Sequence, residues 1–430
     1  MVEIRPFRAY RYNTEKFGED LSNLITQPYD KIDAKMQEEY YRRHEYNYVK
    51  LILPKEENRY EIAAKRLKEW KEKGVFVRDK EPAIYLYVQR FSILGKEYER
   101  RGIIAAMRLH PFEEKIVLPH EKTHKGPKED RLRMLRATKT NLEPGFVLYS
   151  DPEGKVRSIM DKIMKEKPFA YGKDDYGVEN YLWAITDKDD IAAIKEVIDP
   201  QQVVIADGHH RYETAVYFRD EMRKAVGNYS EDHAFNFRMT AMVSIEDPGL
   251  VILPTHRLLL KEKLSEEHFK EIKKYFDVDG ICCSKMAKEF LEENKDRHAF
   301  VIYQDGKYYG LVLKDSADIS EFMKEEWSED YRNLDAVILH SVIFSGIMNL
   351  GDLRIDEDIA YERWIEDAVA KVDSGEAKMA VLMNPTKASQ VLAVARNGER
   401  MPQKTTDFYP KMLSGFTMMP IGPEELLRYD

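Results

Sequence analysis

The chain has 430 residues, more than a single hydrophobic core usually supports, so its length predicts two domains. Hydrophobic residues make up 43% and charged residues 34% of the sequence, a composition typical of a globular protein with a strongly ionic surface. The formal net charge of -9 argues against a protein that coats nucleic acid or lies on a membrane surface.

The cysteines and the apolar segments indicate in which cellular compartment the protein is expected to reside. Cys282 and Cys283 are adjacent, and neighbouring cysteines rarely reach disulfide geometry, so we expect a reducing, cytoplasmic environment. The N-terminus has no long apolar core of the signal-peptide type. The longest apolar-rich stretch, 337–350, is too short to cross a bilayer and predicts a buried helix.

Hydrophobic periodicity predicts the elements of the first half of the chain, where the first fifty residues are expected to be mostly irregular. Gly74 ends the first clear helix, and the first two strands turn around Gly95-Lys96. The predicted elements are a helix at 57–73, strands at 83–91 and 101–109, a polar loop at 111–127, helices at 128–139 and 151–167, a strand at 181–185, and a strand at 202–206 that leads into a helix from residue 209.

Strands and helices do not alternate regularly in the second half, so we expect an α+β architecture with a mixed sheet rather than a doubly wound fold. The densely charged segment 261–267 predicts a boundary between domains at 1–261 and 262–430, with the tail 401–419 returning to the active site. The predicted elements are strands at 240–245 and 250–253, helices at 265–276 and 285–294, a hairpin at 298–314, helices at 333–349 and 362–373, a strand at 379–384, and a helix at 387–397.

The segment 205–211, Ile-Ala-Asp-Gly-His-His-Arg, is the strongest functional signal in the sequence. A strand that ends in Asp207-Gly208 at the start of a helix can bind an anion, because the helix N-terminus presents unpaired N–H groups and a partial positive charge. His209, His210 and Arg211 would add positive charge at that end, which only an anion makes favourable. We therefore predict a phosphate-binding turn; the alternative is that Asp207 merely caps the helix.

A second group of reactive side chains lies in the loop that begins at Pro119. His120-Glu121-x-x-His124 has the spacing of zinc proteases, but Pro119 and Gly126-Pro127 leave little room for the helix that such a zinc site needs. We instead expect the loop to bring Glu121 and several donors to a shared site. A solvated charged loop is the alternative.

Two further segments combine hydroxyl groups with basic side chains. Thr255-His256-Arg257 follows a predicted strand, and Lys404 precedes two threonines. Both segments suit phosphate recognition, although each also suits an ordinary structural or exposed role. The sequence contains no Walker-type loop, no Rossmann glycine motif, no kinase catalytic loop and no Cys/His zinc cluster.

Several segments together resemble a known family. The chain is identified as a member of the family called domain of unknown function one thousand and fifteen. The matching segments are Arg-Pro-Phe-Arg-Ala from residue 5, Gln-Pro-Tyr-Asp from 27, Leu-Pro-His-Glu-Lys-Thr from 118, Gly-Pro-Lys-Glu-Asp-Arg-Leu from 126, Ile-Ala-Asp-Gly-His-His-Arg-Tyr-Glu-Thr-Ala from 205, Leu-Pro-Thr-His-Arg from 253, and Met-Pro-Gln-Lys-Thr-Thr-Asp-Phe-Tyr-Pro-Lys from 401.

The Pro-His-Glu and Asp-Gly-x-His-Arg segments are also similar to those of ParB/sulfiredoxin-like free L-serine kinases. That resemblance implies a ParB-like phosphate-binding region in residues 1–261 and transfer of a phosphoryl group from ATP, ADP or pyrophosphate to free serine. Glu121 would deprotonate the serine hydroxyl, with His120 beside it. Asp207, Gly208, His209, His210 and Arg211 would hold the donor phosphates, and Asp207 would share a Mg²⁺ ion.

The same resemblance suggests further ligands. Lys128, Arg131 and Arg257 would bind other phosphate oxygens or the carboxylate of the acceptor. Thr255, His256 and Lys404 would contribute to phosphate or nucleotide binding. The gap between Glu121 and Asp207 is longer than in the compact kinases, and the second half of the chain has no counterpart in them. Two hypotheses compete with the kinase: a ParB-type protein that binds nucleotide or nucleic acid, either without catalysis or as a CTPase, and a zinc-dependent hydrolase. The acidic charge argues against DNA, and the sequence leaves a homodimer open.

Overall fold

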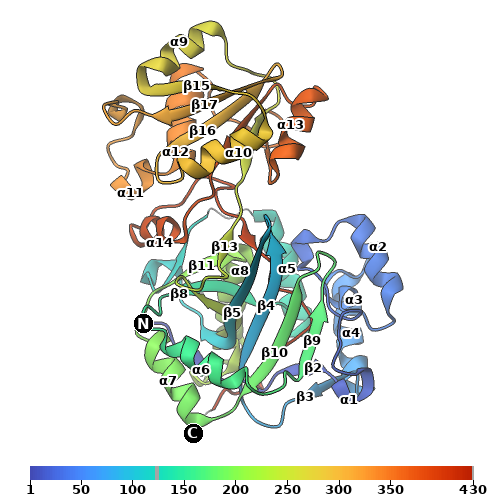
Figure 1. The fold of residues 1–430 in the computed structure, drawn as a ribbon. Coiled ribbons are helices and arrows are strands. Elements are labelled where there is room, and N and C mark those ends of the chain that lie inside the picture. The colour runs from blue at the N-terminus through green and yellow to red at the C-terminus, as the bar shows by residue number, and fades with distance from the viewer. Residues whose placement is uncertain (122–124, 429–430) are drawn as a thin grey trace. The chain divides into compact units, whose positions relative to one another are not determined.

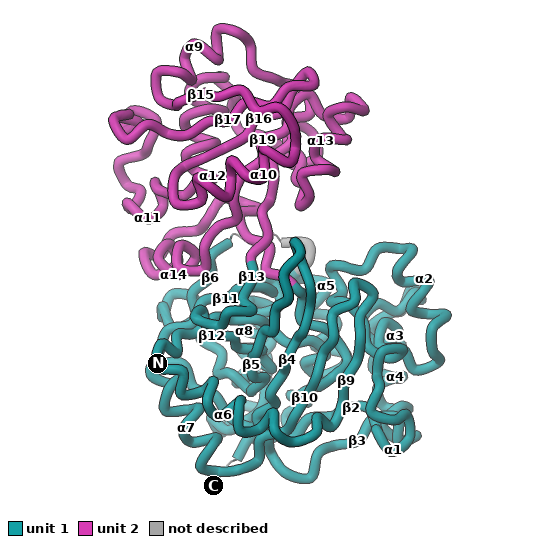
Figure 2. Tube along the Cα trace, in the orientation of Figure 1, with its two compact units in different colours: residues 1–251, 410–430 teal, residues 252–409 magenta. Residues whose placement is uncertain are grey.

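The chain forms two compact units. The computed structural model describes residues 1–121 and 125–428, without the side chains of 125–127. Unit 1 comprises Met1–Val251 and Pro410–Asp430, and unit 2 comprises Ile252–Tyr409 (Figure 2). The boundary therefore differs from the predicted one at 261/262, because the charged segment there is an exposed connection inside unit 2.

Unit 1 is built on a mixed sheet of nine strands in the described part of the chain. Two neighbouring pairs, β11 with β6 and β12 with β8, are parallel, whereas the other pairs are antiparallel. The strands follow one another across the sheet as β6 (Val117–Pro119), β11 (Val203–Asp207), β8 (Gly145–Tyr149), β12 (Phe237–Ser244), β5 (Lys96–Arg108), β4 (Ile84–Ile93), β10 (Glu179–Ile185) and β9 (Ala170–Lys173), with β1 (Ile4–Arg5) beside β5.

Helices cover this sheet with apolar faces. α6 (Lys155–Ile163) and α7 (Lys188–Ile198) lie side by side and bury their aliphatic side chains against alternate residues of β4 and β5 (Figure 1). α5 (Lys125–Thr138) packs on both α4 (Arg59–Glu72) and α8 (His209–Val226). Alternation along each strand thus gives the sheet an apolar face for these helices, which is the ordinary driving force for such a layered unit.

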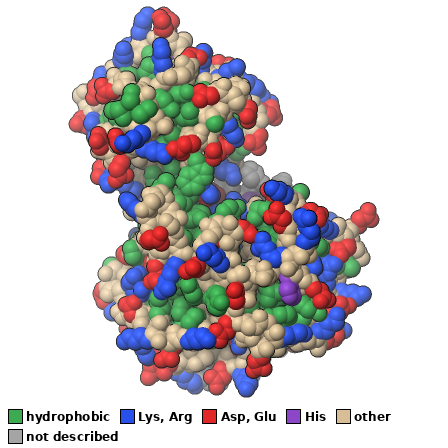
Figure 3. Space-filling view, turned by 45° about the vertical axis from the view of Figure 1, so that its right-hand side comes forward, with side chains coloured by type: hydrophobic (Ala, Val, Ile, Leu, Met, Phe, Trp, Pro, Cys, Tyr) green, Lys and Arg blue, Asp and Glu red, His purple; other side chains and the backbone are tan. Residues whose placement is uncertain are grey.

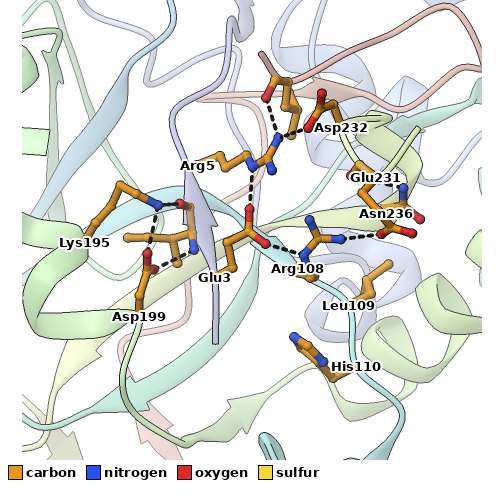
Figure 4. A network of polar contacts seen from close by, with 12 residues as sticks. Glu3, Arg5, Arg108, Leu109, His110, Lys195, Asp199, Glu231, Asp232 and Asn236 are labelled. Atoms are coloured by element: carbon orange, nitrogen blue, oxygen red, sulfur yellow. Dashed lines mark hydrogen bonds and ion pairs between the residues drawn. The ribbon is translucent and has the colours of Figure 1, made fainter. Parts of the chain in front are cut away.

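The N-terminal strand is fixed by ion pairs as well as by pairing with β5 (Figure 4). Glu3 accepts hydrogen bonds from Arg5, at 2.6 Å, and from Arg108. Burial opposes ionisation of Glu3, but the two guanidinium groups outweigh it and lower the pKa of the carboxyl group. Arg5 also donates to Asp232 at 2.8 Å, so the beginning of the chain is tied to the segment before β12.

Buried polar side chains hold the C-terminal segment in unit 1. Arg100 of β5, 1% exposed, donates through Nη2 to the carbonyl oxygen of Pro410 at 2.5 Å. Gln89 of β4 accepts a hydrogen bond from Arg100 Nε at 3.1 Å and donates to the carbonyl oxygen of Lys411 at 3.0 Å. Burial lowers the pKa of Arg100 to about 10. The backbone around Lys411 is thereby fixed to the central strands of the sheet.

Unit 2 has an antiparallel sheet with helices on both faces (Figure 1). One face packs against α9 (Glu266–Tyr275), α12 (Asp335–Ile338) and a π-helix, η5 (Leu339–Ile347). The other face packs against α10 (Ser284–Glu293) and α13 (Ile365–Asp373). The strand order is β15 (Phe276–Ile281), β17 (Lys307–Leu313), β16 (Ala299–Gln304), β19 (Met379–Met383), β14 (His256–Leu259) and β18 (Ile359–Glu362).

The observed architecture confirms the predicted α+β class with a large mixed sheet. The expectation that the first fifty residues are mostly irregular was wrong in part, because they contain the helix α2 (Ala34–Arg43). This helix begins after Asp33, whose side chain caps it. Charged groups of both signs alternate over the visible faces of the two units (Figure 3). Among the described residues, none of the helices has both the length and the apolar character needed to cross a membrane.

Replacing Gln89 with Met should loosen the C-terminal segment. The substitution keeps the side-chain volume but leaves buried groups of Arg100 and Lys411 without their partner, which costs about 1–3 kcal/mol for each unsatisfied group. We expect a lower melting temperature and faster proteolysis after residue 409. Gln202→Met, at an exposed glutamine, is the matched control. Equal cleavage rates in the two variants would contradict this role of Gln89.

Candidate functional site

Two parallel strands bring the two main sequence motifs together. β6 and β11 pair in register from Val117–Val203 to Pro119–Ile205, so both strands end at the same edge of the sheet. His120 follows directly after β6, and Asp207 is the last residue of β11. The backbone N–H of His120 donates to Nε2 of His209 at 3.2 Å. The carboxyl ends of adjacent parallel strands are a common place for ligand sites in mixed sheets.

The turn after β11 requires glycine. Gly208 has φ +88° and ψ +33°, a left-handed conformation that costs little only for glycine, and it is the N-cap residue of α8. A Cβ atom there would lie 3.0 Å from Nε of Arg211. The N-cap residue is Gly208, and no side chain of the described residues donates or accepts a capping hydrogen bond there, so Asp207 is not the N-cap. An uncapped helix N-terminus directs amide N–H groups and a positive dipole end toward a ligand.

The two histidines nearest the turn pack on each other. The rings of His120 and His209 meet edge to face with centroids 4.7 Å apart, and both residues are buried. His120 Nδ1 lies 2.5 Å from the carbonyl oxygen of Ile205, to which it donates. Nε2 of His120 lies 3.9 Å from Oε1 of Glu121, whose side chain is 31% exposed. His120 therefore lies beside Glu121, and Nε2 of His209 accepts a hydrogen bond within the protein.

Asp207 lies among cations. Its Oδ2 is 3.8 Å from Nζ of Lys411 and 3.9 Å from Nη2 of Arg211. Burial alone would raise the pKa of Asp207, but these positive charges outweigh it and hold the pKa well below the ordinary range. The carboxylate is consequently ionised at neutral pH, and it partly balances the positive charge that the sequence places at the helix N-terminus.

The side chain of Arg211 lies beside the turn and reaches into a buried polar cluster. It donates to the carbonyl oxygen of Pro144 at 3.1 Å. Burial would lower the pKa of Arg211, but Glu143 and Asp207 outweigh it and raise the pKa. Glu143 accepts hydrogen bonds from the backbone of Tyr29 and the hydroxyl of Ser414, both at 3.0 Å. One carboxylate thus connects the turn, an N-terminal loop and the C-terminal segment.

The predicted Arg131 belongs to the same cluster. Its guanidinium group stacks over the ring of Tyr29 at 3.9 Å and lies 3.8 Å from Glu143. Burial raises the pKa of Tyr29 to about 12. Arg238 of β12 faces a cavity of about 30 Å³, room for about one water molecule, that Arg131 and Arg211 also line. Burial lowers the pKa of Arg238 to about 9.

The remaining predicted residues are distributed between the units. Lys128 lies in α5 and pairs with Glu213 at 2.8 Å, and His210 is half-buried in the first turn of α8. Thr255, His256, Arg257 and Lys404 belong to unit 2. Lys404 is exposed. His256 and Arg257 follow the short strand β13 (Val251–Ile252), as predicted, but they are buried as the first residues of the next strand, β14. His124 of the His-Glu-x-x-His pattern lies outside the described residues, and α5 begins after it.

Sequence reasoning missed several residues of this site. Lys411 and Tyr29 stand in segments that match the family, so their motif membership was a usable signal. Glu143 and Arg238 gave no such signal, because an isolated acid before a strand and an arginine within one are usually structural. None of the described residues forms a group of three or more His, Cys, Asp or Glu side chains that could hold a metal ion.

Comparison with known proteins identifies one family. The family model described as a protein of unknown function, DUF1015, matches residues 4–337. No curated protein matches the sequence. A free serine kinase in complex with AMP is similar, at 14% identity and a TM-score of 0.33, over 76% of this chain and 93% of its own.

Two further solved structures are similar at the same level. A conserved hypothetical protein from Pyrococcus furiosus has 14% identity and a TM-score of 0.31, over 76% of this chain and 97% of its own. SbnI with a C-terminal truncation, from Staphylococcus aureus, has 10% identity and a TM-score of 0.33, over 73% of this chain and 87% of its own.

Gly208→Ala should weaken anion binding at the turn. The added Cβ is strained at φ +88° and would displace Arg211, so we expect at least about tenfold weaker binding of pyrophosphate, measured by calorimetry. Gly227→Ala is the matched control, because Gly227 ends the same helix at φ +72° with open space around it. Both variants should lose about 1 kcal/mol of stability. Unchanged pyrophosphate affinity in Gly208→Ala would argue against an anion site here.

Proposed function

The chain belongs to the protein family of unknown function DUF1015, and on that premise we propose that it is a small-molecule kinase that phosphorylates the hydroxyl group of free L-serine. The observation that carries the proposal is the contact between the two motif segments at the ends of β6 and β11. Glu121 and the Asp207-Gly208 turn, which we propose binds an anion, thus follow neighbouring strands at one edge of the sheet. A carboxylate base beside a phosphate site is the minimum that phosphoryl transfer to an alcohol requires.

The phosphate donor would bind at the start of α8. The amide groups of the first turn, Arg211 and Lys411 would neutralise its phosphates, with Asp207 fixing both cations. We propose a nucleotide or pyrophosphate as the donor, following the resemblance of the Asp-Gly-x-His-Arg segment to free serine kinases. On the same resemblance we assign β6, β11 and α8 to a ParB/sulfiredoxin-like catalytic region. Positioning and charge neutralisation supply most of the catalysis in phosphoryl transfer.

Glu121 would be the general base. It takes the proton from the serine Oγ as that oxygen forms a bond to the transferred phosphorus. The bond between phosphorus and the bridging oxygen breaks, and the leaving nucleotide or phosphate keeps the electron pair. His120, 3.9 Å away and fixed by the carbonyl of Ile205, would orient Glu121. In this arrangement the base follows β6 and the proposed phosphate-binding turn follows the neighbouring strand β11.

The residues do not fit a resident magnesium site. Asp207 is a single carboxylate with Lys411 and Arg211 both within 4 Å, and Mg²⁺ prefers several oxygen ligands. We therefore propose that Mg²⁺ arrives with the donor's phosphates, as it does for many nucleotide substrates. Binding of ATP or pyrophosphate should then depend on Mg²⁺, whereas the protein alone should retain no stoichiometric magnesium after dialysis.

Glu121→Gln tests the base. Incubation of the purified protein with L-serine, Mg²⁺ and ATP, ADP or pyrophosphate should yield phosphoserine, measured by mass spectrometry. The variant should lose about 10²–10⁴-fold in kcat with little change in donor affinity, because only the proton acceptor is removed. Glu129→Gln, at an exposed glutamate of α5, is the matched control. Full turnover in Glu121→Gln would exclude Glu121 as the base.

A comparison of two lysines tests which part of the tail serves the site. Lys411→Met should weaken donor binding about tenfold or more, because Lys411 is the cation beside Asp207. Lys404→Met tests the residue that sequence alone favours. Loss of donor affinity in Lys404→Met with none in Lys411→Met would reverse this assignment. CTP hydrolysis or salt-sensitive DNA binding without phosphoserine would favour a ParB-type binder instead.

A further inference from the structure

Unit 2 contains a buried arginine with one edge that lacks hydrogen-bond partners among the described residues. Arg257 lies in β14 and is 2% exposed. Its Nη1 donates to the carbonyl oxygen of Thr255 and lies 2.8 Å from the sulfur of Met383. Its Nε and Nη2 have no hydrogen-bond partner among the residues that the structure describes. A buried donor without a partner costs about 1–3 kcal/mol, so two on one group are unusual.

The open nitrogens share one side of the guanidinium plane. Nε and Nη2 carry parallel N–H bonds, and this pair is the one that grips two oxygens of a carboxylate or phosphate in bidentate fashion. Within the described part of unit 2, no acidic side chain forms an ion pair with Arg257. Asp335, whose charge is felt at Arg257, is bound instead to His298 at 2.7 Å.

The charge around Arg257 favours a ligand with one negative charge. Burial and the charge of Arg257 lower the pKa of His256 to about 4 and that of His340 to about 3, although His340 keeps some exposure to solvent. Both rings are therefore neutral near pH 7. A single guanidinium cation is balanced by a monoanion, whereas a phosphate dianion would leave uncompensated charge in a buried place.

The backbone beside Arg257 is also irregular. His340 belongs to the π-helix Leu339–Ile347, and such segments are rare and often accompany functional sites. The Tyr361 ring lies 5.8 Å from the guanidinium carbon, and Tyr361 is partly exposed. Two partly exposed side chains, His340 and Tyr361, therefore lie in the neighbourhood of the buried guanidinium group.

We propose that the Nε–Nη2 edge of Arg257 binds the carboxylate group of a small molecule within unit 2. The site is distinct in its residues from the phosphate-binding turn of unit 1, and it does not depend on the proposed kinase activity. A guanidinium group such as that of Arg257 suits either a phosphate or a carboxylate. The unpartnered bidentate edge and the single balancing charge select the carboxylate.

Methyl resonances of methionine report on this site directly. Met383 contacts the guanidinium group, so its ¹³C-labelled methyl signal, assigned with Met383→Leu, should shift when the full-length protein is titrated with acetate or L-serine. A titration with sodium chloride at matched ionic strength is the control for signal shifts that come from salt screening alone. The shift should saturate with both carboxylates and with inorganic phosphate only at higher concentration.

Variants make the result decisive. Arg257→Lys should bind acetate at least about tenfold more weakly, because an ammonium group cannot form the bidentate pair. Arg257→Met should abolish the shift, whereas Arg363→Lys and Arg211→Met should preserve it. Arg211→Met alters the turn in unit 1, so failure of the proposed kinase site and failure of this site are distinguishable. An unmoved Met383 signal, an equal shift in Arg257→Lys, or tighter binding of phosphate than of acetate would overturn the proposal.

Discussion

The parallel pairing of β6 with β11 is the constraint on which the unit 1 site depends. Both strands are short and buried, and they are held by backbone hydrogen bonds from Val117 to Pro119. On its other side β11 pairs antiparallel with β8, and the register shifts between Ile205 and Asp207. A register shift of this kind changes the direction in which side chains point at the end of a strand. The edge formed by these three strands therefore determines where the Asp207 carboxylate and the start of α8 point.

Charge balance explains how basic residues persist at a helix N-terminus. Arg211 does not simply oppose the helix dipole, because Asp207 and Glu143 lie beside it and raise its pKa. Lys411 reaches Asp207 only because buried hydrogen bonds from Gln89 and Arg100 fix the last segment of the chain to unit 1. The site is therefore assembled from three distant stretches of sequence, and its electrostatics depend on the return of the C-terminus.

The sequence predicts the parts of this arrangement that are local. Periodicity and glycine placement predicted the β4–β5 hairpin, β11 and α8, since those signals lie within a few residues of the elements they define. The helix α7 and the strand β15 were missed. In α7 the helical spacing of Ile191, Ile194 and Ile198 was a usable local signal, whereas β15 is a six-residue strand with acidic residues and a glycine between its apolar ones. Lys411 could be predicted only as part of a motif. Its contact with Asp207 depends on long-range packing, as do the positions of Glu143 and Arg238.

Buried arginines are not equivalent, and their partners separate their roles. Arg100 meets neutral oxygens of Gln89 and Pro410, so its charge serves to join strands to the C-terminal segment. Arg211 is surrounded by acids and remains strongly cationic, which suits a group that faces an anion. Along its Nε–Nη2 edge, Arg257 has neither neutral oxygens nor acidic groups as hydrogen-bond partners among the described residues. Because desolvating a guanidinium group is costly without compensation, an edge that the fold leaves open is better explained by a ligand than by packing.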